Sequence, residues 1–86
     1  MPNNNEKIAK DKLEFAFNNF ALLKSTLNNF SNEELLSMSS SIRNNIKNDS
    51  CISIECKNNK EIVGLRKSLL DEINTLQKKI FEDITQ

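Results

Sequence analysis

Two cysteines are the side chains in this sequence with the most distinctive chemistry. Cys51 and Cys56 lie in the segment CISIEC, and the chain contains no histidine. A zinc site of the Cys/His type therefore lacks ligands, and no imidazole is available for catalysis. The spacing of the cysteines also differs from that of a redox CxxC motif. We interpret them as reduced structural thiols in a loop, with a disulfide or a regulatory pair as the alternative.

Other kinds of catalytic or ligand-binding residues are not grouped in recognisable motifs. Gly64 is the one glycine, so the chain has no Gly-rich loop that could hold a phosphate. The carboxylates are scattered along expected helix faces and form no obvious convergent pair. We therefore predict that the protein is not an enzyme, that it binds no cofactor and that it holds no metal.

Charge and hydropathy limit the partners of the chain. Its 86 residues suffice for one small domain, with 12 Lys and Arg against 12 Asp and Glu. A net charge of zero gives little counterion release, so we expect no direct nucleic-acid binding. The sequence has no 18-residue apolar run and no signal-like start, so we expect no membrane span and a cytoplasmic location.

The apolar residues of the N-terminal third predict a long helix. They recur at alternating steps of four and three residues, which is typical of a helix that packs along another helix. Phe15, Phe17 and Leu22 widen this stripe, which could then meet more than one neighbour. An ordinary core helix and an intermolecular seam explain the pattern equally well. The stripe consists of Ala9, Leu13, Ala16, Phe20, Leu23, Leu27 and Phe30.

A second helix is predicted over residues 32–47. Ser31 and Glu34 have the spacing of a capping box, which marks a helix N-terminus. The helix interior then holds four serines, at positions 37, 39, 40 and 41, which are weak helix formers. Either these serines face solvent or they allow another chain to approach closely. A short helix of this kind depends on packing more than on propensity.

A loop and a third helix are predicted for the rest of the chain. Residues 48–59 are expected to be a loop, in which the alternation of Ile52 and Ile54 is typical of a short strand or extended linker. Residues 60–84 carry a regular apolar stripe and predict a long helix. Residues 1–5 are expected to be frayed.

These elements predict an all-α fold and a single domain over residues 1–86. It would have two long helices and one short one, arranged as a coiled-coil-like hairpin. Because so elongated a hairpin leaves apolar stripes uncovered, we expect a homodimer or a hetero-oligomer with a helical protein. The residues predicted to form the interface are Leu13, Phe20, Leu23, Leu27, Leu35, Ile42, Leu69, Ile73, Leu76 and Ile80.

The segment FNNFALLKSTLNNFSNEELLSMSSSIRNNIK resembles the N-terminal oligomerisation region of the histone-like nucleoid-structuring family. In that family an Asn-Asn-Ile…Leu-Arg helix is followed by a tight corner, a capped Glu-x-Leu helix and a long coiled-coil helix. Asn18, Asn19, Ser31 and Leu35 follow this order, and residues 61–84 stand where the long helix would be. The insert NDSCISIECKNN departs from the pattern, as does the absence of the family's DNA-binding module.

The resemblance implies an oligomerisation module that lacks a DNA reader and acts by mixing with full-length partners. We therefore predict a non-enzymatic interaction protein that dimerises and modulates a partner, with a nucleoid-associated transcriptional regulator as the implied partner. Two alternatives stay open. The chain could be a compact inhibitor or immunity protein of phage or plasmid type that binds a toxin or host enzyme, or it could be a secretion chaperone.

Overall fold

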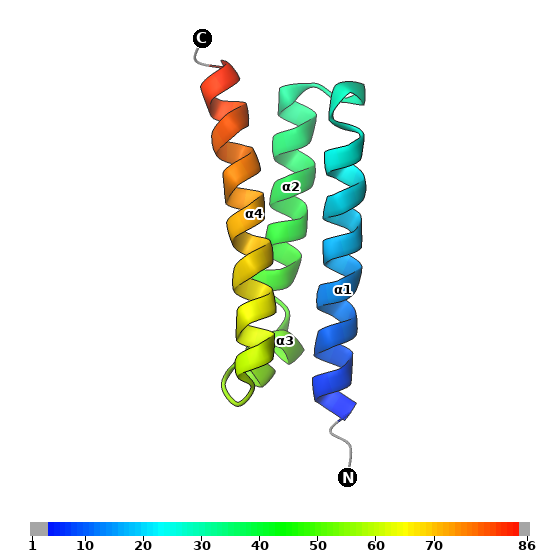
Figure 1. The fold of residues 1–86 in the computed structure, drawn as a ribbon, viewed down its shortest axis with the longest axis vertical. Coiled ribbons are helices and arrows are strands. Elements are labelled where there is room, and N and C mark those ends of the chain that lie inside the picture. The colour runs from blue at the N-terminus through cyan, green and yellow to red at the C-terminus, as the bar shows by residue number, and fades with distance from the viewer. Residues whose placement is uncertain (1–3, 85–86) are drawn as a thin grey trace.

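The computed structural model describes residues 4–84, and every regular element within that range is helical. The elements are α1 (Asn4–Ser25), a 3-10 turn η1 (Leu27–Asn29), α2 (Asn32–Lys47), α3 (Ser50–Cys56) and α4 (Lys60–Ile84). Helices α1, α2 and α4 run up, down and up beside one another, and α3 lies across the lower end (Figure 1). The result is a rod with extents of 53 × 19 × 17 Å.

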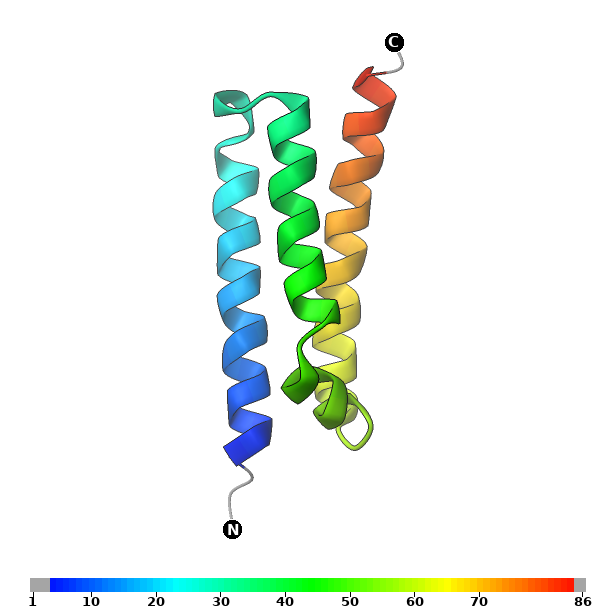
Figure 2. The same cartoon turned by 180° about the vertical axis from the view of Figure 1, so that it is seen from behind.

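The all-α prediction is confirmed, and so are the bounds predicted for the second and third helices. The number of helices was wrong, because residues 4–84 form four α-helices in place of three. The expected hairpin is also corrected: α2 does not merely connect two long helices but packs between α1 and α4 along most of its length (Figure 2).

The predicted loop over residues 48–59 was wrong, because its centre folds as helix α3. Asp49 caps this helix, with its Oδ1 atom accepting a hydrogen bond of 3.0 Å from the backbone N–H of Ile52. Ile52 is buried in the core while Ile54 is exposed. Two isoleucines separated by one residue therefore reflect one buried and one exposed position of a helix, and no strand forms.

The two ends of α1 also differ from expectation. Asn4 and Asn5 belong to the helix and are not frayed, whereas residues 1–3 lie outside the described range. The helix ends at Ser25, where the hydroxyls of Ser25 and Thr26 donate to the carbonyl of Leu22 at 2.7 and 3.0 Å. These side chains compete with the helical backbone pattern and favour the 3-10 turn that follows.

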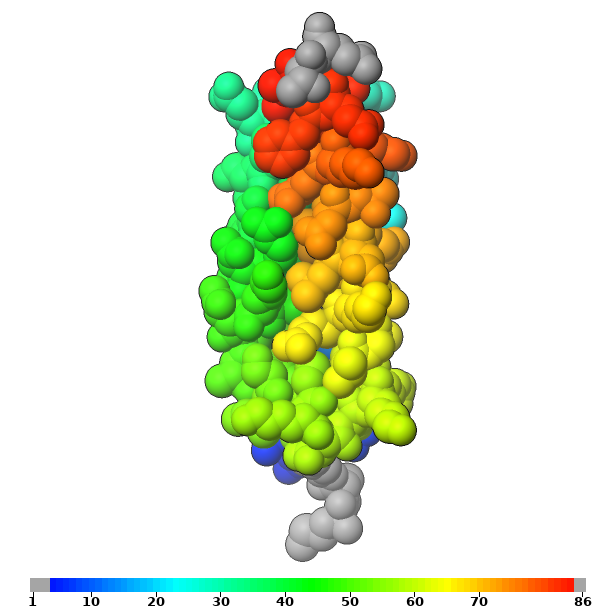
Figure 3. Space-filling model, turned by 90° about the vertical axis from the view of Figure 1, so that its left-hand side faces the viewer, coloured from blue at the N-terminus to red at the C-terminus, as the bar shows by residue number. Residues whose placement is uncertain are grey.

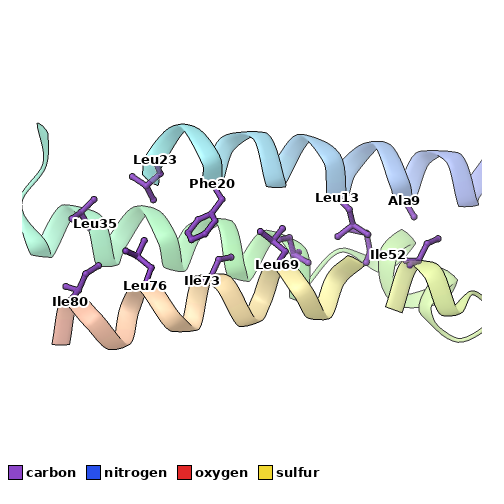
Figure 4. Close-up of a cluster of buried hydrophobic side chains, with 12 residues drawn as sticks. Ala9, Leu13, Phe20, Leu23, Leu35, Ile52, Leu69, Ile73, Leu76 and Ile80 are labelled. Carbon is purple, nitrogen blue, oxygen red and sulfur yellow. The ribbon is translucent and has the colours of Figure 1, made fainter. Parts of the chain in front are cut away.

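The hydrophobic core runs along the axis of the rod. Side chains of α1 point toward α2 and α4, and Ile52 of α3 fills the lower end (Figure 4). Leu27 and Phe30, which follow α1, are partly buried against the same cluster. The buried members are Ala9, Leu13, Phe20, Leu23, Leu35, Ile46, Ile52, Ile62, Leu69, Ile73, Leu76 and Ile80.

The serines of α2 divide between solvent and the contact with α4. Ser39 is fully buried and donates to the carbonyl of Leu35 at 2.7 Å. The amide nitrogen of Gln77 donates to Ser39 and Ser40, at 2.9 Å each. Small side chains at these positions let α4 approach closely, and Figure 3 shows α2 and α4 in contact along this side. The close approach is therefore to another helix of the same chain.

The corner before α2 is a capping box, as predicted. Glu34 donates its backbone N–H to the Ser31 hydroxyl at 3.1 Å, and the Ser31 N–H donates to Glu34 Oε1 at 3.0 Å. The second contact lowers the pKa of Glu34, because it favours the ionised carboxylate.

Replacing Ser31 with alanine is expected to lower the free energy of unfolding by about 1 kcal/mol through loss of the cap. Urea denaturation followed by circular dichroism measures this change. Ser37→Ala is the control, since Ser37 is exposed inside the same helix and alanine is the better helix former. If Ser37→Ala lowered the free energy of unfolding as much as Ser31→Ala, the loss could not be assigned to the helix cap.

Candidate interaction surface

The structure places most of the predicted interface residues in the core of a single chain. Leu13, Phe20, Leu23, Leu35, Leu69, Ile73, Leu76 and Ile80 are buried, and Leu27 and Ile42 are partly exposed. A partner could reach the eight buried side chains only if the helices separated. The surface available for association must therefore be found among residues that stay exposed in the folded chain.

A second apolar line runs along the outside of α1. Ile8, Phe15 and Leu22 are 44%, 68% and 65% exposed. They are seven residues apart, and seven residues of a straight α-helix complete two turns to within about 20°. The three side chains therefore lie in one line nearly parallel to the helix axis. Phe15 and Leu22 were predicted to widen the apolar stripe, whereas Ile8 was not predicted, although its spacing of seven from Phe15 is visible in the sequence.

Helix α2 borders this line and turns it into a groove. One hollow of ≈190 Å³ lies around Phe15, and a second of ≈380 Å³ lies around Leu22. Both are lined by Asn19 of α1 and by Ile42 and Asn45 of α2, so they adjoin. We call this surface the α1–α2 face, made by Phe15, Asn19 and Leu22 of α1 and by Met38, Ile42 and Asn45 of α2.

The other two grooves of the bundle are bridged by polar side chains. Between α1 and α4, Lys10 pairs with Glu61 at 3.1 Å and Lys24 pairs with Glu72 at 3.3 Å. Between α2 and α4, the Arg43 guanidinium donates to Gln77 at 2.8 Å. Side chains that already bridge two helices resist displacement, so these grooves are less suited to an incoming apolar side chain.

The α1–α2 face is uncharged over its central part. The charged residues within residues 13–25 and 35–46 are Glu14, Lys24 and Arg43. Lys24 and Arg43 are engaged with α4, and Glu14 lines a hollow with Leu65 of α4. An apolar and amide-rich surface of this kind can be buried without removing a charge from water.

A salt bridge marks the lower end of the face. Lys12 Nζ lies 2.8 Å from Asp49 Oδ2, which joins α1 to the N-terminus of α3. Burial would raise the pKa of Asp49, but the Lys12 ammonium and the Ile52 backbone N–H outweigh this effect and lower it. The pair therefore stabilises the fold when Asp49 is ionised.

Asp49→Asn is expected to reduce the loss of stability in acid. A carboxylate whose pKa is lowered by folding stabilises the protein above its unfolded pKa, and this contribution disappears as the pH falls through the folded value. Asparagine keeps the helix cap but cannot form the ion pair. Thermal unfolding at pH 7 and at about pH 3 measures the effect. Lys12→Met should act like Asp49→Asn, and additive losses in the double variant would contradict the pairing.

The two cysteines take no part in the α1–α2 face. Both are partly buried on α3, and the Cys51 thiol lies 3.5 Å from the carbonyl oxygen of Asn5. Five residues along a helix rise about 7.5 Å, whereas the Cα atoms of a disulfide lie about 4.4–6.8 Å apart. The helical geometry of α3 therefore keeps the two sulfurs from pairing with each other.

Two further properties concern the described residues as a whole. Over residues 4–84, no helix combines the length and the apolar character that crossing a membrane requires. In the same range, Cys, Asp and Glu side chains do not gather in threes or more in a way that could hold a metal ion.

Comparison with known proteins gives no match to this chain: no family model, no curated protein and no solved structure is sufficiently similar. The resemblance to the nucleoid-structuring family thus stays a prediction from the sequence.

Proposed function

We propose that this protein is a non-enzymatic interaction module that associates through the α1–α2 face and thereby modulates a partner protein. The observation that carries the proposal is the position of Phe15 and Leu22, two large apolar side chains that are about two-thirds exposed beside the groove between α1 and α2. Exposed apolar side chains gathered in a groove mark interaction sites, and a groove between helices is suited to an amphipathic helix.

The partner implied by the sequence resemblance is a nucleoid-associated regulator with a similar helical region. The chain would then join the assembly of that regulator through the α1–α2 face. The balance of charges supports this part of the proposal, because a neutral chain changes the DNA complexes of a partner through protein contacts and not through phosphate contacts.

A specific observation favours the second candidate function, that of a compact inhibitor of a toxin or host enzyme. The core of the bundle is closed within one chain, with Leu13, Phe20, Leu69 and Ile73 all buried. The fold therefore does not need a partner helix to cover its main apolar stripes. In this case the α1–α2 face would bind a target of a different fold.

The test compares three variants as baits in extracts of the source cell. Phe15→Glu and Leu22→Glu place a charge in the α1–α2 face, and Ile54→Glu places the same charge on an exposed apolar position of α3. We expect a specific partner to be retained by the native chain and by Ile54→Glu, and to be lost with the other two. Equal retention by all variants would overturn the proposal.

The identity of the retained protein separates the two candidate functions. A nucleoid-associated protein supports modulation of transcription, and gel-shift experiments should then show that the chain alters its DNA complexes. A toxin or metabolic enzyme supports the inhibitor function. Tight duplex-DNA binding by the isolated chain at physiological salt would contradict both, since it needs a positive surface that the neutral composition does not supply.

A further inference from the structure

The apolar side chains on the outside of α1 are evenly spaced about Phe15, which suits contact with a second copy of the chain. Ile8 and Leu22 lie at equal distances of seven residues on either side of Phe15. Phe15 also lies at the centre of α1, which spans 22 residues from Asn4 to Ser25. A two-fold axis beside Phe15 would therefore place α1 antiparallel to the α1 of a second copy, with Ile8 opposite Leu22 and the two helices overlapping over their full length.

The charge of the α1–α2 face permits self-association. The hollow around Leu22 has no charged lining residue, and the hollow around Phe15 is lined by Lys12 and Asp49, which neutralise each other as an ion pair of 2.8 Å. A parallel arrangement would place Lys12 opposite Lys12 of the second copy, because this residue lies between Ile8 and Phe15 on the same side of the helix. In the antiparallel arrangement Lys12 meets Asn18 and Asn19, which are neutral. Like charges at facing positions are destabilising, so the antiparallel arrangement is favoured.

The hollow beside Phe15 has room for the ring of a second phenylalanine. Its volume is ≈190 Å³, and its lining combines apolar side chains, two amides and the paired charges of Lys12 and Asp49. The lining residues are Lys12, Phe15, Ala16, Asn19, Ile42, Asn45, Ile46, Asp49 and Ile52. A cavity of about 150 Å³ is large enough to hold benzene. On a two-fold axis each Phe15 could fill the hollow of the other copy, and this adds contacts with α2 to those between the two α1 helices.

The area along α1 approaches that of a stable dimer interface. A standard interface buries about 800 Å² on each partner, which is about 13% of the 5969 Å² exposed by this chain. The two copies overlap along α1, whose 22 residues span about 33 Å, and a strip of this length and of the 17 Å width of the rod has an outline of about 560 Å² before side chains are counted. A two-fold interface of this kind closes on itself and does not lead to open chains.

We infer that a second copy of this chain occupies the α1–α2 face, as an antiparallel two-fold dimer whose axis passes beside Phe15. The inference rests on the proposed function, since it names the partner of the same surface. It makes the α1–α2 face the centre of a bundle formed by α1 and α2 of both copies. The main apolar stripes of the helices stay buried in the core of each chain and take no part in the dimer interface.

The test is disulfide cross-linking in a chain that carries Cys51→Ser and Cys56→Ser. Ile8→Cys and Leu22→Cys are made separately in that background, and one of them carries a tag so that mixed dimers are distinguishable. Oxidation of the mixture should yield about tenfold more mixed dimer than either variant yields of its own homodimer, because only the mixed pair brings two sulfurs within bonding distance. Ile54→Cys, outside the face, is the control for random collision.

Each other outcome overturns the inference in a distinct way. Homodimers of Ile8→Cys and of Leu22→Cys that form more readily than mixed dimers would indicate a parallel arrangement. Cross-linking no greater than that of Ile54→Cys, together with the mass of a single chain at micromolar concentration, would exclude the second copy as occupant. If the chain were a monomer but Phe15→Glu abolished capture of a cellular partner, the dimer would be excluded and the proposed function would stand. If the chain were a monomer and Phe15→Glu did not affect capture, both the dimer and the proposed function would be excluded.

Discussion

Replacing Phe20 with alanine is expected to destabilise the fold by about 3–5 kcal/mol. The ring is 1% exposed and lies in the C-terminal third of α1, where it points toward α2 and α4 (Figure 4). Removing it loses the transfer free energy of the side chain and leaves a cavity that the surrounding helices fill only in part. Small domains are stable by only about 5–15 kcal/mol, so this variant should lose a large part of its stability.

Phe81→Ala is the matched control for this prediction. It removes the same atoms, but the Phe81 side chain is 56% exposed near the end of α4. Substitutions at such surface positions usually change stability by about 0.5 kcal/mol or less. Urea denaturation followed by circular dichroism gives both values. Similar losses for the two variants would contradict the assignment of Phe20 to the core.

Replacing Ser39 with leucine is the second large effect that we expect, at about 2–4 kcal/mol. Ser39 is fully buried in the contact between α2 and α4, where its hydroxyl accepts a hydrogen bond from the Gln77 amide. A leucine must push the helices apart, which costs about 1–3 kcal/mol. It also removes one acceptor of the Gln77 amide, for about 1 kcal/mol more.

The neighbouring serines make this prediction specific. Ser37→Leu introduces the same side chain on the same helix at an exposed position, where it should change stability little. Ser39→Ala keeps the small volume and should lose only the hydrogen bond. Thermal unfolding of the three variants therefore separates the effect of side-chain volume on stability from the effect of losing the hydrogen bond. If Ser39→Leu were as stable as Ser37→Leu, the close contact between α2 and α4 would not exist.

The sequence predicted α2 and α4 because their signals are local and strong. A capping box fixes where α2 begins, and a long stripe of period 3.6 defines α4. The prediction for the segment around Ile52 was wrong because the segment is short and because the spacing of its two isoleucines is compatible with both a strand and a helix. Asp49, three residues before Ile52, was the available signal for a cap.

The candidate interaction surface was less predictable than the fold. An apolar stripe shows that a helix face is covered, but it does not say whether the covering helix belongs to the same chain. Residues such as Leu13 and Ile73 were therefore predicted at an interface and lie in the core of one chain. The shorter apolar line through Ile8, Phe15 and Leu22 can be interpreted only once the structure shows that the main apolar stripe of α1 is buried within the same chain.

Sedimentation equilibrium on the native chain, Phe15→Glu and Ile54→Glu tests association through the α1–α2 face most directly. The native chain and Ile54→Glu are expected to approach twice the 9.9 kDa mass of one chain as the micromolar concentration rises. Phe15→Glu should stay at the mass of a single chain, because dimer formation would bury its carboxylate without a partner. A native chain that stays at 9.9 kDa at every concentration, or a Phe15→Glu variant that dimerises as well as Ile54→Glu, would contradict self-association through this surface.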